Sequence, residues 1–159
     1  QQIEHRDLAP RVARLLNQYR LTEGQLELEV TESTLMGQHE HATQTLFDLE
    51  KIGVQLSIDD FGTGYSSLSY LKRLPVHRLK IDRSFVLDIG RDPNDEAIVR
   101  AVIALGQSMS LQLIAEGVER PEQADFLLRE GCHLVQGFWY GKPLSPEEIY
   151  QRFGLPAAK

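Results

Sequence analysis

The sequence predicts an α/β fold with a parallel β-sheet. Five short segments of strand type are separated by amphipathic segments of helical period along the whole chain. Regular alternation of strands and helices is typical of parallel sheets, in which a helix crosses over between neighbouring strands. At 159 residues the chain is long enough for one domain with a hydrophobic core, and no linker or low-complexity segment divides it. We therefore expect a single domain over residues 1–159.

Helical spacing and strand alternation place four elements in the first sixty residues. Two segments carry apolar residues three or four positions apart, and the second ends at Gly53, a residue favoured after a helix. Each is followed by a segment in which apolar and polar residues alternate, which predicts a strand. In order, the elements are a helix from Asp7 to Tyr19 with Leu8, Val12, Leu15, Leu16 and Tyr19 on its inner face, a strand over Leu26–Thr31, a helix over 39–51 and a strand over Val54–Asp60.

The remaining chain continues this alternation. A short helix over Ser66–Leu74 stops before a proline, and Asn94 is expected to cap a long helix with an apolar face. Gly131 ends a helix from Pro121 to Glu130, and a capping box at Ser145 begins the last helix. The predicted strands between these helices are Arg78–Asp82, Ser110–Glu116 and His133–Gly137.

The number of strands leaves the type of parallel sheet open. Five strand–helix units have the repeat length of a (β/α)8 barrel, but a closed barrel needs eight strands and typically about 250 residues. An open, doubly wound sheet fits the length better on counting alone. Both architectures gather their active sites at the carboxyl ends of the strands.

Asp59 and Asp60 form the strongest candidate site, because they end a predicted strand and directly precede a glycine-containing loop. Neighbouring carboxylates repel each other and resist burial unless a cation or a set of donors compensates them. A bound divalent metal ion is the simplest compensation. For this pair we place the metal interpretation ahead of a purely structural one.

The pattern predicts that each of the other strands is apolar until its C-terminal end, where a polar side chain follows. Carboxylates that converge with one amine suggest Mg2+ or Mn2+, and a metal pair suits phosphoester hydrolysis with one bridging carboxylate. Plainer interpretations remain open: a solvated strand residue, a surface lysine, or acids that cap helices or begin them. The side chains concerned are Glu29, Glu32, Lys80, Asp82, Glu116, Glu119 and Gln136.

Composition excludes several classes of partner. The formal charge of −6 argues against a nucleic-acid partner held by a basic surface, although metals could still attract a small phosphorylated ligand. The single Cys132 excludes an internal disulfide and favours a cytoplasmic setting, and we expect it to be a small buried residue. No apolar run approaches a membrane span and no signal peptide is visible, so no membrane contact is expected. Trp139 and Tyr140 could line a pocket, but packing in the core is the first expectation for both.

Five segments occur in an order that is far more specific than any one of them. They are Leu26–Ser33 (LELEVTES), Asp59–Leu68 (DDFGTGYSSL), Leu79–Val86 (LKIDRSFV), Ala115–Glu119 (AEGVE) and Gln136–Phe138 (QGF). Together they resemble the EAL domain family, the cyclic-di-GMP phosphodiesterases of bacterial second-messenger signalling. The resemblance covers essentially the whole chain.

The resemblance implies a modified (β/α)8 barrel that hydrolyses cyclic-di-GMP to the linear dinucleotide pGpG with two Mg2+ or Mn2+ ions. It also implies a role for each candidate side chain. Glu29 would bind the first metal, Asp59 would bridge both and Asp60 would serve the second. Lys80 would hold or help activate the attacking water, supported by Glu116 and Gln136. Glu119 would act near the leaving group or behind the residues that touch the metals. Glu32 would anchor the Phe61–Ser67 loop, which in the family contributes to metal binding and often to dimer contacts.

The chain departs from the family at its front. The Glu-Ala-Leu signature and the Asn of the family's next strand, both ligands of the first metal, are absent from this sequence. We therefore expect the C-terminal portion of the domain, a partial TIM-like barrel with the first two or three strands missing from this chain. Exposed barrel edges would favour a homodimer or another association. A sensory or cyclase domain could precede this segment in the parent protein.

Two other functions compete with the phosphodiesterase. With two metal ligands missing, this chain alone is expected to be inactive, and a non-catalytic receptor for cyclic-di-GMP is then the main alternative. An unrelated metal-dependent barrel enzyme, such as an enolase-type lyase, would explain the acids and Lys80 but not the Phe61–Leu68 segment.

Overall fold

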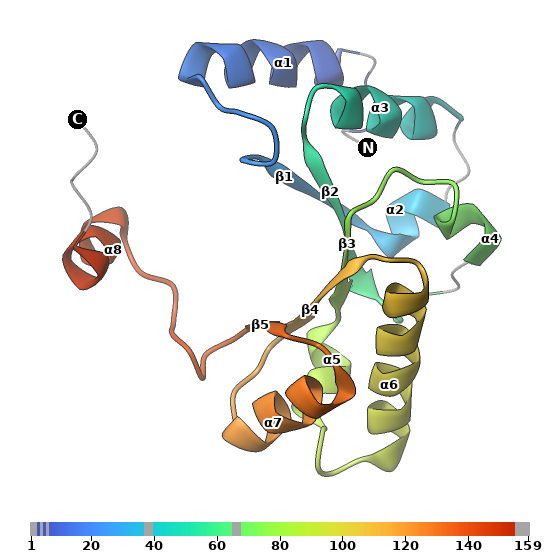
Figure 1. Ribbon diagram of the computed structural model, residues 1–159, viewed down its shortest axis with the longest axis vertical. Helices are drawn as coiled ribbons and strands as arrows, with labels where there is room; N and C mark the ends of the chain where they lie inside the picture. The colour runs from blue at the N-terminus through green and yellow to red at the C-terminus, as the bar shows by residue number, and fades with distance from the viewer. Residues whose placement is uncertain (1–2, 4, 6, 37–39, 65–67, 155–159) are drawn as a thin grey trace.

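The five strands form one parallel sheet in which neighbours along the chain are also neighbours in space (Figure 1). The computed structural model describes residues 3, 5, 7–36, 40–64 and 68–154, and every statement of structure below refers to them. A doubly wound sheet reverses its strand order, whereas this order never reverses. The parallel α/β class is confirmed, and the topology is that of part of a barrel. The strands are β1 (Glu27–Thr31), β2 (Gln55–Phe61), β3 (Arg78–Ile81), β4 (Gln112–Glu116) and β5 (Leu134–Gln136).

Helices follow the strands as predicted, with two additions and two corrections. The five-residue helices α2 and α5 were not expected. The helix predicted over Ser66–Leu74 ends at Leu71, and its first two positions lie outside the described residues. Asn94 does not cap the long helix: Asp92 has extended backbone angles and accepts a hydrogen bond from Asn94 N at 2.8 Å, and Pro93 is the first helical residue. The helices are α1 (Leu8–Tyr19), α2 (Glu32–Met36), α3 (Glu40–Lys51), α4 (Leu68–Leu71), α5 (Arg83–Leu87), α6 (Pro93–Ser108), α7 (Pro121–Glu130) and α8 (Pro146–Phe153).

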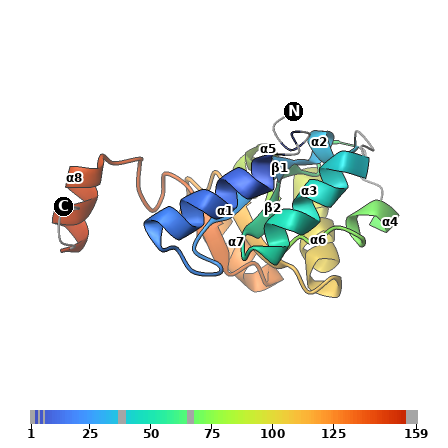
Figure 2. The same cartoon turned by 90° about the horizontal axis from the view of Figure 1, so that it is seen from above.

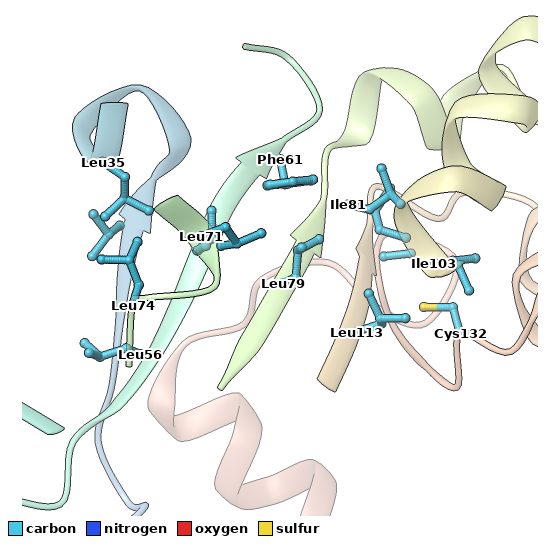
Figure 3. Packing of buried hydrophobic residues seen from close by; sticks show 14 of the residues in the cluster. Leu35, Leu56, Phe61, Leu71, Leu74, Leu79, Ile81, Ile103, Leu113 and Cys132 are labelled. Carbon is cyan, nitrogen blue, oxygen red and sulfur yellow. The ribbon is translucent and has the colours of Figure 1, made fainter. Parts of the chain in front are cut away.

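The two faces of the sheet differ in chemistry. One face is apolar and packs against the helices, and Figure 3 shows part of this core around Leu56, Leu79 and Ile81. The opposite face is mostly polar, because successive side chains of a strand point to opposite sides. Paired residues in the register place its side chains together: Glu27, Glu29 and Thr31 on β1, Gln55, Ser57 and Asp59 on β2, Arg78 and Lys80 on β3, and Gln112 and Glu116 on β4.

This polar face corrects the expectation that each strand is apolar until its end. Glu27, Arg78 and Gln112 lie at the beginnings of their strands, and Arg78 joins the other two through an ion pair and a hydrogen bond of 2.8 Å. Polar side chains therefore extend along the whole face. The sheet needs only one apolar face because the helices cover only one.

Two expectations about the core are wrong. On α1, the residues buried against the core are Ala9, Val12 and Leu16, whereas Leu15 is 51% and Tyr19 66% exposed. Trp139 and Tyr140, expected in the core, are also about half exposed. No helix in the described part of the chain is both long and apolar enough to cross a bilayer.

Helix α8 lies apart from the other elements in both views, at the end of an extended segment (Figures 1 and 2). Its predicted start is confirmed. Ser145 Oγ accepts a hydrogen bond from Glu148 N, while the Glu148 carboxylate accepts one from Ser145 N. None of its residues is buried, so its fold depends on local capping rather than on packing.

Cys132 is 1% exposed and packs in the core beside β4, as expected (Figure 3). Burial raises the pKa of its thiol to about 11. At about pH 8 the thiolate is therefore scarce as well as inaccessible. We expect no reaction with a thiol reagent in the native state over minutes, and full reaction after unfolding in urea. Stoichiometric labelling of the native chain within seconds would contradict this placement.

Candidate active site

Lys80 lies at the centre of a cluster of carboxylates on the polar face of the sheet. Its Nζ atom is 2.6 Å from Glu29 Oε1, 2.7 Å from Glu116 Oε1 and 3.0 Å from Asp59 Oδ1. The lysine side chain is only 7% exposed, whereas Glu29 is half exposed at the rim. Strands β1, β2 and β4 thus bring one carboxylate each to the lysine of β3. We call these four side chains the Lys80 cluster.

The Lys80 cluster keeps its lysine charged. Burial by itself lowers the pKa of Lys80, but the contacts with Glu116, Glu29 and Asp59 outweigh it and raise the pKa above the usual value of a lysine. The hydrogen bonding of Asp59 is less complete than that of Lys80. Its buried Oδ1 atom has no hydrogen-bond partner of favourable geometry among the described residues, although the ammonium lies 3.0 Å away.

A β-bulge shapes the end of β2. Ile58 pairs with Leu79 and Phe61 with Ile81, so three steps along β2 match two along β3. Within the bulge, Asp60 adopts a left-handed backbone conformation with a φ of 55°, which is uncommon for a residue other than glycine. Backbone of this kind concentrates at functional sites, where it redirects side chains.

Asp60 lies outside the Lys80 cluster, beside Asp82 at the end of β3. Asp60 is exposed, but desolvation by neighbouring atoms raises the pKa of its carboxyl, and repulsion from Asp59 and Asp82 raises it further. Asp82 itself caps α5, because its carboxylate accepts a hydrogen bond from Ser84 N at 2.9 Å. The capping role that the sequence left open for Asp82 is therefore found.

The chemistry of these side chains fits a hard divalent cation, but their arrangement holds an ammonium. Glu29, Asp59 and Asp60 offer the carboxylate oxygens that Mg2+ and Mn2+ prefer, and among the described residues the buried Oδ1 atom of Asp59 has only its ion pair with Lys80. In the described part of the chain, however, no three Asp, Glu, His or Cys side chains surround a point suited to a metal ion. Lys80 occupies the position between the carboxylates.

Glu32 contacts the backbone of the loop that follows β2. Its Oε2 atom accepts hydrogen bonds from Gly62 N at 2.9 Å and from Gly64 N at 3.3 Å. The glutamate is 2% exposed at the start of α2, so it connects two distant segments of the chain. Residues 65–67 of the predicted loop lie outside the described residues. The anchoring role of Glu32 remains a prediction, with this geometry in its favour.

Glu119 and Gln136 do not join the Lys80 cluster but line a neighbouring pocket of about 380 Å3. Glu116 belongs to both, and so connects them. Glu119 Oε1 forms an ion pair with Arg83 at 2.7 Å. The pocket also has two cations and an aromatic ring on its walls. Among its lining residues are Arg83, Glu116, Glu119, Gln136, Phe138 and Lys142.

Gln123 is a positioning residue that the sequence reasoning missed. It is fully buried, and its Oε1 accepts hydrogen bonds from the backbone N–H groups of Glu119 and Arg120. Its Nε2 donates to the carbonyl oxygens of Val86 and Leu87 at the end of α5. The side chain thereby fixes the segment that presents Glu119. The only signal in the sequence is a glutamine at the third position of a helix that begins with proline, a common site for capping.

The family model described as "EAL domain" matches residues 1–143. The signaling protein YkoW of Bacillus subtilis is 49% identical over 150 residues, which cover 94% of this chain and 19% of that protein. The bifunctional diguanylate cyclase/cyclic di-GMP phosphodiesterase MucR of Pseudomonas aeruginosa is 47% identical over 148 residues, covering 93% of this chain and 22% of that protein. The chain thus spans about a fifth of the length of these relatives.

Two solved structures have the same architecture at high sequence identity. The phosphodiesterase of PaMucR in its c-di-GMP complex has a TM-score of 0.89 and 47% identity, covering 93% of this chain and 60% of that chain. The EAL domain of DcpA from Mycobacterium smegmatis also has a TM-score of 0.89, with 46% identity, covering 98% of this chain and 69% of that chain.

Proposed function

This chain belongs to the EAL domain family, and we propose on that premise that it forms part of a phosphodiesterase that hydrolyses cyclic-di-GMP to linear pGpG. The main structural support is the convergence of Glu29, Asp59 and Glu116 on Lys80 where parallel strands end. In barrel folds this edge is where active sites lie. The similarity to the phosphodiesterase of MucR supports the choice of substrate.

In the proposed site, Glu29 and Asp59 bind divalent metal ions together with Asp60, and Mg2+ or Mn2+ is our choice because the ligands are carboxylates. Such ions would offset the phosphate charge and lower the pKa of a water molecule. Lys80 donates a hydrogen bond to the attacking water and thereby orients it. Two further acids and an amide complete the site: Glu116 and Gln136 support that water, and Glu119 lies on the side of the leaving group.

We also propose how the chain fits into a larger assembly. It would be the C-terminal part of an EAL domain whose first two or three strands lie outside residues 1–159, which agrees with its coverage of 60% and 69% of two solved chains. Association through β1 and β5, as a homodimer or with another polypeptide, would cover the outer strands of the sheet. The parent protein would combine this domain with a sensory or cyclase domain. A cytoplasmic location agrees with the single, buried Cys132.

Hydrolysis of cyclic-di-GMP tests the proposal, with pGpG measured by chromatography. A complete EAL domain that includes this segment is expected to form pGpG in Mg2+ or Mn2+, and Lys80→Ala is expected to stop it. The present chain alone should show negligible turnover, because the Glu-Ala-Leu strand is absent. Failure of the complete domain to form pGpG in either metal would refute the phosphodiesterase.

Calorimetry separates this function from the second candidate, a non-catalytic receptor. The specific observation in favour of a receptor is that Lys80, rather than a metal-binding arrangement, organises the carboxylates. If the complete domain binds cyclic-di-GMP with no turnover in either metal, the receptor is the better account. If it neither binds nor hydrolyses the dinucleotide, both candidates are wrong.

A further inference from the structure

The Lys80 cluster has the dimensions of an ammonium site. The three oxygens lie 2.6–3.0 Å from Nζ, the range of charge-assisted hydrogen bonds and ion pairs. A Mg2+ ion binds its oxygen ligands at about 2.0–2.1 Å. A metal ion would therefore have to take the second oxygen of each carboxylate or displace the ammonium from the first, and in both cases two cations share the negative charge of Glu29 and Asp59.

We propose that Lys80 and a divalent metal ion compete for the carboxylates of Glu29 and Asp59, so that the lysine sets the metal affinity of the site. In this role Lys80 is an internal counter-ion, in addition to its proposed contact with the attacking water. A metal ion that binds these two carboxylates must share their negative charge with the ammonium or displace it. This inference depends on the metal site of the proposed function, but it concerns binding and not turnover.

Electrostatics gives the direction of the effect. Three carboxylates brought together without a cation repel one another, and partial burial strengthens this repulsion. Lys80 removes most of it, and a metal ion then gains less by binding. With a neutral side chain at position 80, the repulsion among the three carboxylates persists until a metal ion binds and relieves it. The metal should therefore bind more tightly when the lysine charge is removed.

Arg78 provides a matched control. It lies two residues before Lys80 on the same face of β3, and it also forms an ion pair with a glutamate of β1. Its partners are Glu27 and Gln112, and none of its ion pairs or hydrogen bonds involves the Lys80 cluster. Arg78→Met thus removes one positive charge from the same face without freeing the carboxylates of Glu29 and Asp59.

The experiment is calorimetric titration of the full chain with Mn2+. Lys80→Met is expected to bind Mn2+ at least about tenfold more tightly than the unmodified chain. Its midpoint of thermal unfolding should be lower without metal and should rise more when Mn2+ is added. Lys80→Arg and Arg78→Met should bind Mn2+ within about threefold of the unmodified chain. Equal or weaker binding by Lys80→Met, including no detectable binding by either protein, would overturn the competition.

A measurement on the unmodified chain covers the case in which Lys80→Met does not fold. The ammonium signal of Lys80 is identified by NMR from its absence in Lys80→Arg, and Mg2+ is then added. Competition requires this signal to shift or to disappear through faster exchange with water. An unchanged signal while Mg2+ shifts the carboxylate resonances of Glu29 and Asp59 would overturn the competition but leave the metal site intact. A spectrum in which Mg2+ shifts no signal at all would also overturn the competition. Absence of cyclic-di-GMP hydrolysis by the complete domain would instead refute only the phosphodiesterase.

Discussion

Asp59→Asn is expected to lower kcat for cyclic-di-GMP hydrolysis by about a thousandfold in a complete EAL domain, or about 4 kcal/mol of transition-state stabilisation. The physical reason is the position of Asp59 beside both Lys80 and the bulge that contains Asp60. An amide of the same shape removes one negative charge from the proposed metal site. Steady-state formation of pGpG in Mg2+ measures the change.

Asp48→Asn is the control for this prediction. Asp48 lies on the exposed surface of α3, where it pairs with Lys51, and its loss should leave kcat within about twofold of the unmodified value. Asp59→Asn should remain folded, because an uncharged residue relieves repulsion with its neighbour Asp60. A folded Asp59→Asn domain with unaltered turnover would exclude Asp59 from the metal site.

Gln123→Ala is expected to lower the free energy of unfolding by about 3 kcal/mol, since several buried backbone groups lose their hydrogen bonds at once. The amide side chain bonds to the backbone of Glu119, Arg120, Val86 and Leu87, and it is fully buried. Urea denaturation followed by circular dichroism measures the loss. The truncation also leaves a cavity, which adds to the cost.

Glu122→Ala, one residue earlier on α7, is the matched control, because Glu122 is exposed and none of the described ion pairs or hydrogen bonds involves its side chain. Its effect should stay within about 0.5 kcal/mol. If Gln123→Ala unfolds at the same urea concentration as the unmodified chain, the four hydrogen bonds contribute nothing net to stability. The segment that presents Glu119 would then need another support.

The order and type of the long elements could be predicted because their patterns are local. Pro121–Glu130 and the start of α8 coincide with the expected capping residues, and all five strands were located within about two residues. The short helices α2 and α5 were missed because a single turn carries too few apolar positions to show a period. Leu15 and Tyr19 were assigned to the core because helical periodicity marks an apolar stripe without showing how much of it is covered.

The residue types of the candidate site could also be predicted, since motifs fix them at strand ends. Which of these residues contact one another could not be predicted. Glu29, Asp59, Lys80 and Glu116 meet in one cluster, whereas Glu119 forms an ion pair with Arg83 in the adjoining pocket. A pattern along one strand does not show which strand lies next to it. Partners in space depend on sheet order and register.

The sequence by itself determined the fold class, the family and the chemical character of the site: a carboxylate pair, a lysine and further acids on a parallel sheet. These are consequences of side-chain chemistry and of periods two to four residues long. Only the tertiary structure decided that Lys80 is the common partner of three strands and that a bulge directs Asp59 and Asp60 differently. Both features depend on contacts between residues at least twenty positions apart. Such contacts combine electrostatic and packing energies, which no local sequence pattern shows.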